Sequence, residues 1–225
     1  MRGAVAVVVG AGGGIGGALA DALRADPRHA AVVALRRPML DLTDEASIVA
    51  AARALPEGQL RLVFDATGFL HDTAQRPERS WRELDAAALA RNFALNAIGP
   101  ALLMKHFLPL LPRQGRAVFA TLSARVGSIG DNRLGGWYGY RAAKAALNQL
   151  VRTAAIELAR THPDAVCVAL HPGTVATPLS APFAKTGLAL RSPAAAAADL
   201  LAVVEALTPA QTGGFLDWRG QPVPW

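Results

Sequence analysis

The chain has 225 residues, of which 52% are hydrophobic, and its 23 lysines and arginines exceed its 17 acidic residues to give a formal net charge of +6. This length fits one α/β domain with a sizeable buried core. The basic residues are scattered and no nucleic-acid-binding signature occurs, so the charge indicates a solvated surface and we expect no nucleic-acid partner.

Other classes of protein are also disfavoured. The apolar run at the N-terminus is too short for a signal peptide, and no stretch approaches the roughly 18 uncharged residues of a membrane span. The single cysteine, Cys167, lies in an apolar run, so we expect a buried strand residue and no internal disulfide. The five histidines lack metal-ligand spacing, and we expect no metal. The sequence therefore predicts a soluble, cytoplasmic protein that does not bind a membrane.

The first element is the run AVAVVV at residues 4–9, whose continuous apolar character is typical of a strand covered on both faces. A helix is expected at 15–25, so the glycines between the two lie at a helix N-terminus, where unpaired N–H groups attract a pyrophosphate. Because the turn should begin directly after the strand, we favour the second of two templates that fit, Gly12-x-Gly14-x-x-Gly17 and Gly10-x-x-x-Gly14-x-Gly16. Neither contains the Lys-Ser/Thr pair of a P-loop.

The second strand, expected at 30–35, is followed directly by Arg36 and Arg37. NAD-binding folds place an acidic residue here for the ribose 2′-hydroxyl, whereas arginines can pair with the 2′-phosphate of NADP. Only three residues separate Leu35 from Met39, fewer than a parallel crossover needs. We therefore expect the helix between the second and third strands of such a fold to be missing, with residues 39–41 at most a vestigial strand.

The middle of the chain continues the alternation of helices and strands. A helix at 44–55, capped by Thr43, leads to a strand at 60–68. A long helical stretch at 85–111 is expected to bend or break at Gly99-Pro100. A strand at 116–123 then precedes a glycine-rich loop at 124–137.

The helix expected at 138–160 places Tyr140 and Lys144 four residues apart, and therefore on one face. A tyrosine with its ordinary pKa of about 10 is a poor acid–base group at neutral pH. An adjacent ammonium favours the phenolate, lowers this pKa and allows the tyrosine to exchange a proton with a carbonyl or an alcohol. The alternative interpretation is a core tyrosine beside a surface lysine.

The remaining elements are a strand at 165–173, an apolar segment at 179–191 that we expect to cover a partly apolar substrate, a helix at 192–207 and a strand at 213–218. Strands that alternate with helices predict an α/β fold with a doubly wound, Rossmann-like parallel sheet. Without repeats or a linker-like stretch, residues 1–225 are interpreted as one domain.

These motifs, in this order, resemble the short-chain dehydrogenase/reductase family over essentially the whole chain. The segment GAGGGIG (10–16) is similar to the family's cofactor glycine motif, and YRAAK (140–144) to its Tyr-x-x-x-Lys. HPGTVAT (171–177) resembles its Pro-Gly-x-x-x-Thr segment, and Asn96 its helix asparagine. The stretch that ends in this Tyr-x-x-x-Lys helix resembles most the branch of the C-factor signalling proteins and the sniffer-type carbonyl reductases.

The resemblance implies a role for each matching residue. Tyr140 would be the acid–base group, while Lys144 would lower its pKa and hold the nicotinamide ribose. Ser123, with Ser128 as the competing candidate, would hydrogen-bond the substrate oxygen, and Asn96 would hold a water that joins Lys144 to solvent. Val175 and Thr177 would contact the nicotinamide carboxamide, and Asp41-Leu42 the adenine. The predicted cofactor-binding set is Gly10, Gly12, Gly13, Gly14, Ile15, Gly16, Arg36, Arg37, Asp41, Leu42, Ala66, Thr67, Gly68, Asn96, Tyr140, Lys144, Pro172, Gly173, Val175 and Thr177.

The chain departs from the family's pattern at two places. Val9 stands where a threonine commonly precedes the first glycine, and the usual Asn-Asn-Ala-Gly is DATG at residues 65–68. Asp65 thus replaces an amide by a group that only accepts hydrogen bonds when it is ionised. Its partners are not evident from the sequence.

The sequence and the resemblance together predict an NADP(H)-dependent oxidoreductase that interconverts a carbonyl and a secondary alcohol, with NAD(H) as the alternative cofactor. The competing interpretation is a dinucleotide-binding signalling protein of the C-factor type with little turnover. We expect a small-molecule substrate, and a homodimer or homotetramer formed through the helices at 85–111 and 138–160.

Overall fold

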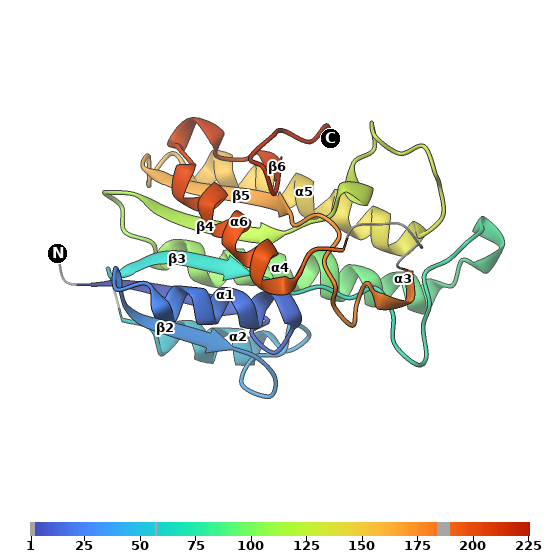
Figure 1. Ribbon diagram of the computed structural model, residues 1–225, viewed down its shortest axis with the longest axis horizontal. Helices are drawn as coiled ribbons and strands as arrows, with labels where there is room; N and C mark the ends of the chain where they lie inside the picture. Colours follow the sequence, from blue (N-terminus) through green and yellow to red (C-terminus); the bar gives the residue numbers. More distant parts are fainter. Residues whose placement is uncertain (1–2, 57, 184–189) are drawn as a thin grey trace.

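The computed structural model describes residues 3–56, 58–183 and 190–225, and contains a six-stranded parallel sheet of order β2-β1-β3-β4-β5-β6 (Figure 1). The strands are β1 (Ala4–Val9), β2 (His29–Leu35), β3 (Leu60–Asp65), β4 (Ala117–Leu122), β5 (Ala165–His171) and β6 (Phe215–Asp217). The helices are α1 (Gly14–Ala25), α2 (Glu45–Arg53), α3 (Ala86–Phe93), α4 (Gly99–Phe107), α5 (Tyr138–Leu158) and α6 (Pro193–Ala206). The predicted Rossmann-like α/β fold is confirmed.

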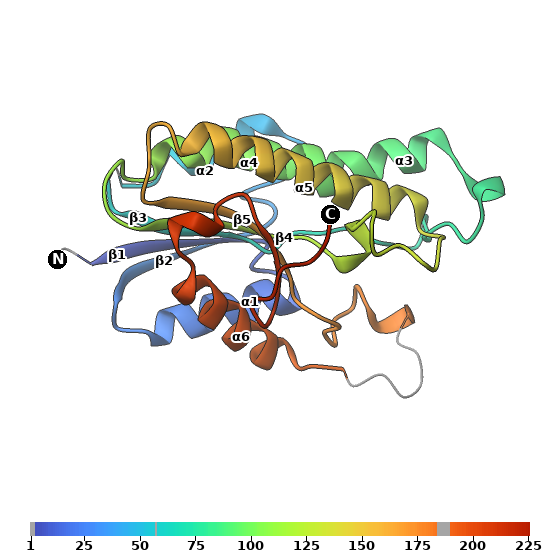
Figure 2. The ribbon, with the colours of Figure 1, turned by 90° about the horizontal axis from the view of Figure 1, so that it is seen from above.

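Helices cover both faces of the sheet, α1 and α6 on one side and α2, α4 and α5 on the other (Figure 2). The valines of β1 divide between two cores because successive side chains point to opposite faces. Val7 and Val9 pack in the core under α2, α4 and α5, whereas Val8 packs in the core under α1 and α6. This explains the continuous apolar run, since β1 lies between β2 and β3 and no face of it meets water.

The helical stretch after residue 85 does not break at its Gly-Pro pair. It runs from α3 through a π-helical segment, Ala94–Ile98, directly into α4. Pro100 lies in the first turn of α4, where a helix tolerates proline. The irregularity is therefore one wide turn before Gly99, so the expected break is wrong, and the alternative of a bend stays a prediction.

The run Ala86–Leu110 is long and apolar enough, by length and composition alone, to cross a membrane. The expectation that no stretch approaches a membrane span was therefore too strong. Leu103, Met104 and Phe107 of this run are buried in the core against the sheet. Packing of this kind is typical of a helix that covers a sheet face.

The connection from β2 to β3 also differs in detail from the prediction. No helix lies between Leu35 and Met39, as expected, but residues 39–41 form no vestigial strand, and α2 itself joins β2 to β3. Asp44, not Thr43, caps α2, because its side chain accepts a hydrogen bond from the Ala46 N–H. Thr43 instead donates its hydroxyl to Asp41 at 2.7 Å.

The turn between β1 and α1 distinguishes the glycines that the geometry requires from those that it does not. Gly10 has a φ of +84°, which favours glycine, and a Cβ on Gly16 would lie 2.2 Å from the Gly10 carbonyl oxygen. A Cβ on Gly17 would lie at an ordinary 3.5 Å from the Ala11 carbonyl oxygen. These contacts support the template that begins at Gly10 and includes Gly16.

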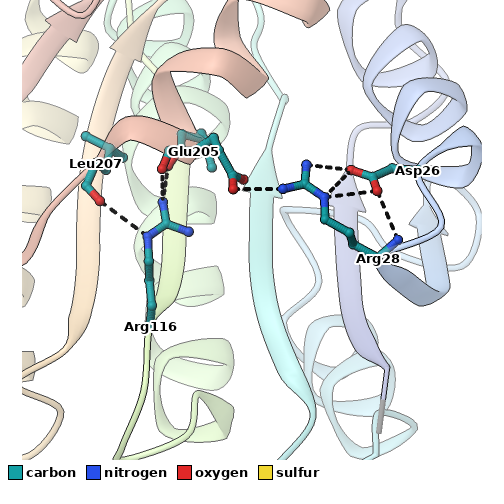
Figure 3. Close-up of polar contacts among 6 residues, drawn as sticks. Asp26, Arg28, Arg116, Glu205 and Leu207 are labelled. Atoms are coloured by element: carbon teal, nitrogen blue, oxygen red, sulfur yellow. Dashed lines mark hydrogen bonds and ion pairs between the residues drawn. The ribbon is translucent and has the colours of Figure 1, made fainter. Parts of the chain in front are cut away.

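At the opposite end of the strands, arginines tie α6 to the sheet (Figure 3). Arg116, just before β4, donates to the carbonyl oxygens of Val204, of Glu205 at 3.0 Å and of Leu207 at 3.3 Å. These carbonyls lie at the C-terminal end of α6, where its dipole is negative, and that of Val204 also accepts from the Leu207 N–H. Arg28 in turn pairs with the Glu205 carboxylate at 2.8 Å.

We predict that Arg116→Ala lowers the free energy of unfolding by about 1–2 kcal/mol, because it removes charge-assisted hydrogen bonds from these carbonyls. Urea unfolding followed by circular dichroism measures the change. Arg113→Ala, at an exposed arginine three residues earlier, is the matched control and should be neutral. Equal effects of the two substitutions would contradict a capping role for Arg116.

We predict that Gly16→Ala destabilises the protein by about 1–3 kcal/mol, because its new methyl group overlaps the backbone of Gly10. Gly17→Ala, one residue along the same helix, should instead be neutral or stabilising, since alanine is the better helix former. Thermal unfolding of the two variants provides the comparison. A Gly16→Ala protein as stable as the Gly17→Ala protein would contradict this assignment of the glycines.

Candidate functional site

A cavity of about 660 Å³ lies where β1, β2 and β3 end and their following loops begin. In an open α/β sheet, this edge is where ligands bind. Ten of the predicted cofactor-binding residues line the cavity: Gly10, Gly12, Gly13, Arg36, Arg37, Asp41, Leu42, Ala66, Thr67 and Gly68. The structure therefore brings the glycine turn, the arginine pair and the DATG segment together around one space.

The N-terminus of α1 opens onto the same region. Gly13 is its N-cap and offers no side-chain cap, so the N–H groups of the first turn remain available for an anion. Gly14 approaches Thr177 so closely that a Cβ on it would lie 3.0 Å from the threonine Cγ2. Thr177, predicted to contact the nicotinamide, is thereby placed beside the start of α1.

The Tyr140–Lys144 pair lies on the buried face of α5. Lys144 is 2% exposed and donates from Nζ to the Leu122 carbonyl oxygen at 2.8 Å, at the end of β4. The Lys144 Nζ lies 5.9 Å from the centre of the Tyr140 ring. A Cβ on Gly68 would lie 4.0 Å from the same Nζ, which connects the pair to the cavity. Lys144 is thus a buried residue, and its interpretation as a surface lysine is wrong.

The predicted effect of Lys144 on Tyr140 is absent from this structure. Burial raises the pKa of Tyr140 above its ordinary value, and burial lowers the pKa of Lys144 to about 8. Desolvation disfavours the charged form of each group, and for Tyr140 it accounts for the raised pKa. The tyrosine is therefore held as the neutral phenol at neutral pH, the form that donates a proton.

Asn96 lies in the π-helical segment and is fully buried. Its side chain accepts from the Phe69 N–H at 2.9 Å and donates to the Phe69 carbonyl oxygen at 2.7 Å. The amide therefore fixes the chain just after Gly68, at the wall of the cavity. π-Helical turns occur frequently at functional sites, which fits this position. The water-holding role implied by the resemblance stays a prediction.

The two candidate serines make different contacts. Ser123, directly after β4, donates from Oγ to the Asn148 side-chain oxygen at 2.7 Å. Ser128 accepts from the Asp131 N–H at 3.1 Å. Asn148 follows Lys144 by four residues, and hence shares a face of α5 with Tyr140 and Lys144. The choice between the serines stays a prediction, although Ser123 is the one linked to this face.

Asp65, at the end of β3, has the partners that the sequence did not reveal. One carboxylate oxygen accepts from the Thr67 N–H at 3.0 Å and from the Thr67 hydroxyl at 2.6 Å. The other accepts from the Thr121 hydroxyl at 2.6 Å. Asp65 pairs with Thr121 in the parallel register of β3 and β4. The carboxylate therefore joins two central strands and orders the turn into the cavity.

A series of edge-on aromatic contacts begins at Tyr140. Trp137 lies edge-on to Tyr140, with ring centres 6.3 Å apart, and edge-on to Phe183 at 5.0 Å. The His71 ring lies edge-on to Phe183 at 5.3 Å. These side chains come from three separate loops. The expected lid at 179–191 is described up to Phe183 and from residue 190, and its remaining part, 184–189, lies outside the described residues.

Sequence reasoning missed several residues of this region. Asn148 could have been found, because it continues the four-residue spacing of Tyr140 and Lys144. Thr121 could not, since only the pairing of β3 with β4 places it against Asp65. Phe69, Asp72 and Arg91 line the cavity, and Arg91 lies over the Phe69 ring at 4.4 Å. They carry no motif that marks them in the sequence.

Comparison with known proteins agrees with this geometry. A protein-family model described as Enoyl-(Acyl carrier protein) reductase matches residues 19–205. The protein C-signal of Myxococcus xanthus is 38% identical over 144 residues, which are 64% of this chain and 82% of that protein. The 1-hydroxy-2-glutathionyl-2-methyl-3-butene dehydrogenase of Rhodococcus sp. (strain AD45) is 33% identical over 195 residues, 84% of this chain and 79% of that enzyme.

Solved structures show the same relationship. The NADPH-bound carbonyl reductase from chicken fatty liver superimposes with a TM-score of 0.86 at 26% identity, covering 100% of this chain and 95% of that one. The carbonyl reductase Sniffer of Drosophila melanogaster, at 22% identity, shares the fold over 100% of both chains with a TM-score of 0.83. The chain therefore belongs to the short-chain dehydrogenase/reductase family of oxidoreductases.

Proposed function

We propose that the protein is an NADP(H)-dependent carbonyl reductase that uses Tyr140 as its general acid. The observation that carries this proposal is the buried Tyr140–Lys144 face of α5, which adjoins Gly68 at the wall of a cavity lined by Arg36 and Arg37. A protein that only binds a dinucleotide has no need of a buried acid–base pair.

The residues present fit a dinucleotide with a 2′-phosphate. The start of α1 offers free N–H groups for a pyrophosphate, and Arg36 and Arg37 supply positive charge after β2, where NAD-binding folds carry an acidic residue. Asp41 and Leu42, predicted to contact the adenine, line the same cavity. When bound, NADPH supplies the hydride. The NADPH-bound carbonyl reductase with the same fold supports this choice of cofactor.

Residues of the chain would then donate the proton and orient the substrate carbonyl. Tyr140, which is a neutral phenol at pH 7, would donate its phenolic proton to the carbonyl oxygen. The Lys144 ammonium, held by Leu122, would stabilise the phenolate that remains. Ser123 would hold the substrate oxygen if its hydroxyl turns from Asn148 toward the site.

The aromatic side chains of Trp137, Phe183 and His71 favour a substrate with an apolar, ring-containing body. Aromatic rings prefer edge-on or offset contacts with one another, as Trp137 and Phe183 make here, and a substrate ring would pack in the same way. We therefore propose aryl ketones and aldehydes as better substrates than small polar carbonyl compounds.

We predict that Tyr140→Phe lowers kcat for NADPH-dependent reduction of an aryl ketone by about 10²–10⁴-fold, because the general acid is lost. NADPH absorbance over a panel of aryl and small polar carbonyl compounds measures turnover, and calorimetry measures NADPH binding, which should be retained. Tyr138→Phe, at the other tyrosine of the same helix, is the matched control and should stay active. Full turnover by the Tyr140→Phe protein would contradict the mechanism.

The same panel separates the enzyme from the alternative of a dinucleotide-binding signalling protein. NADPH binding without turnover of any carbonyl compound would favour the signalling role. Reduction that depends on Tyr140 would favour the enzyme.

We predict that Arg36→Ala/Arg37→Ala weakens NADPH binding at least about tenfold while it changes NADH binding little, because only NADPH has the 2′-phosphate that the guanidinium groups would pair with. Calorimetric titration with both cofactors provides the comparison. Arg53→Ala, at an exposed arginine of α2, is the charge-matched control. An equal loss of affinity for both cofactors would show that the arginines do not select between them.

A further inference from the structure

Lys144 is a charged side chain enclosed by protein. It is 2% exposed, and its one hydrogen-bond acceptor among the described residues is the Leu122 carbonyl oxygen. Transfer of an ammonium ion from water into such a place is costly unless an opposite charge lies near it. Asp65, at the end of the neighbouring strand β3, carries such a charge when ionised and is 0% exposed.

The hydrogen bonds around Asp65 favour its ionised form. Both of its oxygens accept hydrogen bonds, one from the Thr67 N–H and hydroxyl and the other from the Thr121 hydroxyl. The N–H can only donate, and neither hydroxyl has another acceptor among the described residues. An ionised carboxylate, which only accepts, satisfies all three donors. An asparagine side chain would present its own N–H₂ to one of them.

The same strands connect Asp65 to Lys144. Asp65 pairs with Thr121 in the sheet, and the carbonyl that follows, that of Leu122, receives the Lys144 ammonium. The charge of Asp65 raises the pKa of Lys144, against burial, which lowers it to about 8. Burial is the largest influence on Asp65 and raises its pKa above the ordinary value, although the hydrogen bonds from the two threonines and the charge of Lys144 act to lower it. Within the described residues, Tyr140 also faces Lys144, with its ring centre 5.9 Å from the ammonium nitrogen.

We propose that Asp65 is a positioning residue that acts as the buried counter-charge of Lys144 and keeps it as an ammonium ion at neutral pH. This inference rests on the proposed function, in which the ammonium stabilises the Tyr140 phenolate. It also gives the replacement of the family's asparagine a chemical reason, because an amide has no charge to offer. Asp65 thus acts through Lys144 and need not touch the substrate.

The experiment is a direct titration of Lys144 in the apo protein. The chain has only three lysines, Lys105, Lys144 and Lys185, so ¹³C-lysine labelling gives three Cε signals, and Lys144→Arg identifies one of them. We expect a midpoint for Lys144 near pH 8 in the unmodified protein. In Asp65→Asn the midpoint should fall by about one pH unit or more, because the favourable charge is lost.

The matched control is Asp21→Asn, which removes the same charge from an exposed position on α1. It should leave the Lys144 midpoint unchanged. An Asp65→Asn midpoint equal to that of the unmodified protein would overturn the proposal. With turnover as a second readout, the alkaline limb of the kcat/KM profile should move to lower pH in Asp65→Asn, in parallel with the Lys144 midpoint.

A further measurement uses only the unmodified protein, so it does not depend on whether the Asp65→Asn variant folds. The ¹³Cγ shift of Asp65 in the unmodified protein should be that of a carboxylate at pH 7, and the shift of a protonated carboxyl would overturn the proposal. Neither titration requires catalysis, so the result stands even if Tyr140→Phe proves fully active and the proposed function fails. Conversely, an unshifted Lys144 would remove the role of Asp65 and leave the carbonyl reductase intact.

Discussion

The parallel direction of all six strands is the constraint on which the rest of this structure depends. Because every strand runs the same way, each returns through a helix, and both faces of the sheet must be covered. The apolar side chains of the strands are therefore buried between the two sheet faces and the helices. The loops that follow the strands meet at one edge of the sheet. The glycine turn, the arginine pair and the DATG segment follow three different strands and still line one cavity.

The charged side chains at this edge of the sheet, Lys144 and Asp65, are buried. Lys144 and Asp65 are both enclosed, and each would cost free energy alone. The backbone carbonyl of Leu122 and the hydroxyls of Thr67 and Thr121 supply the hydrogen bonds that make these charges tolerable. The same enclosure holds Tyr140 in its neutral form, which suits a group that gives a proton to a carbonyl.

The opposite end of the sheet serves stability. There, arginines bind the carbonyls at the end of α6 and the carboxylate of Glu205. These helix-end and charged groups therefore have partners inside the protein. At the cavity, by contrast, Gly13 leaves the first turn of α1 uncapped by any side chain. The two ends of one sheet thus use the same physical groups, helix termini and charged side chains, in opposite ways: one satisfied internally, the other open to a ligand.

The sequence by itself determined the order of elements, the glycines at the start of α1 and the shared face of Tyr140 and Lys144, because these depend on local periodicity and backbone geometry. It placed the helix break and the cap of α2 wrongly, since the π-helical turn and the competing Thr43–Asp41 contact depend on neighbouring groups. Only the tertiary structure decided the protonation of the site. The pKa of Tyr140 and the partners of Asp65 follow from desolvation and from cross-strand pairing, and neither is a property of nearby sequence.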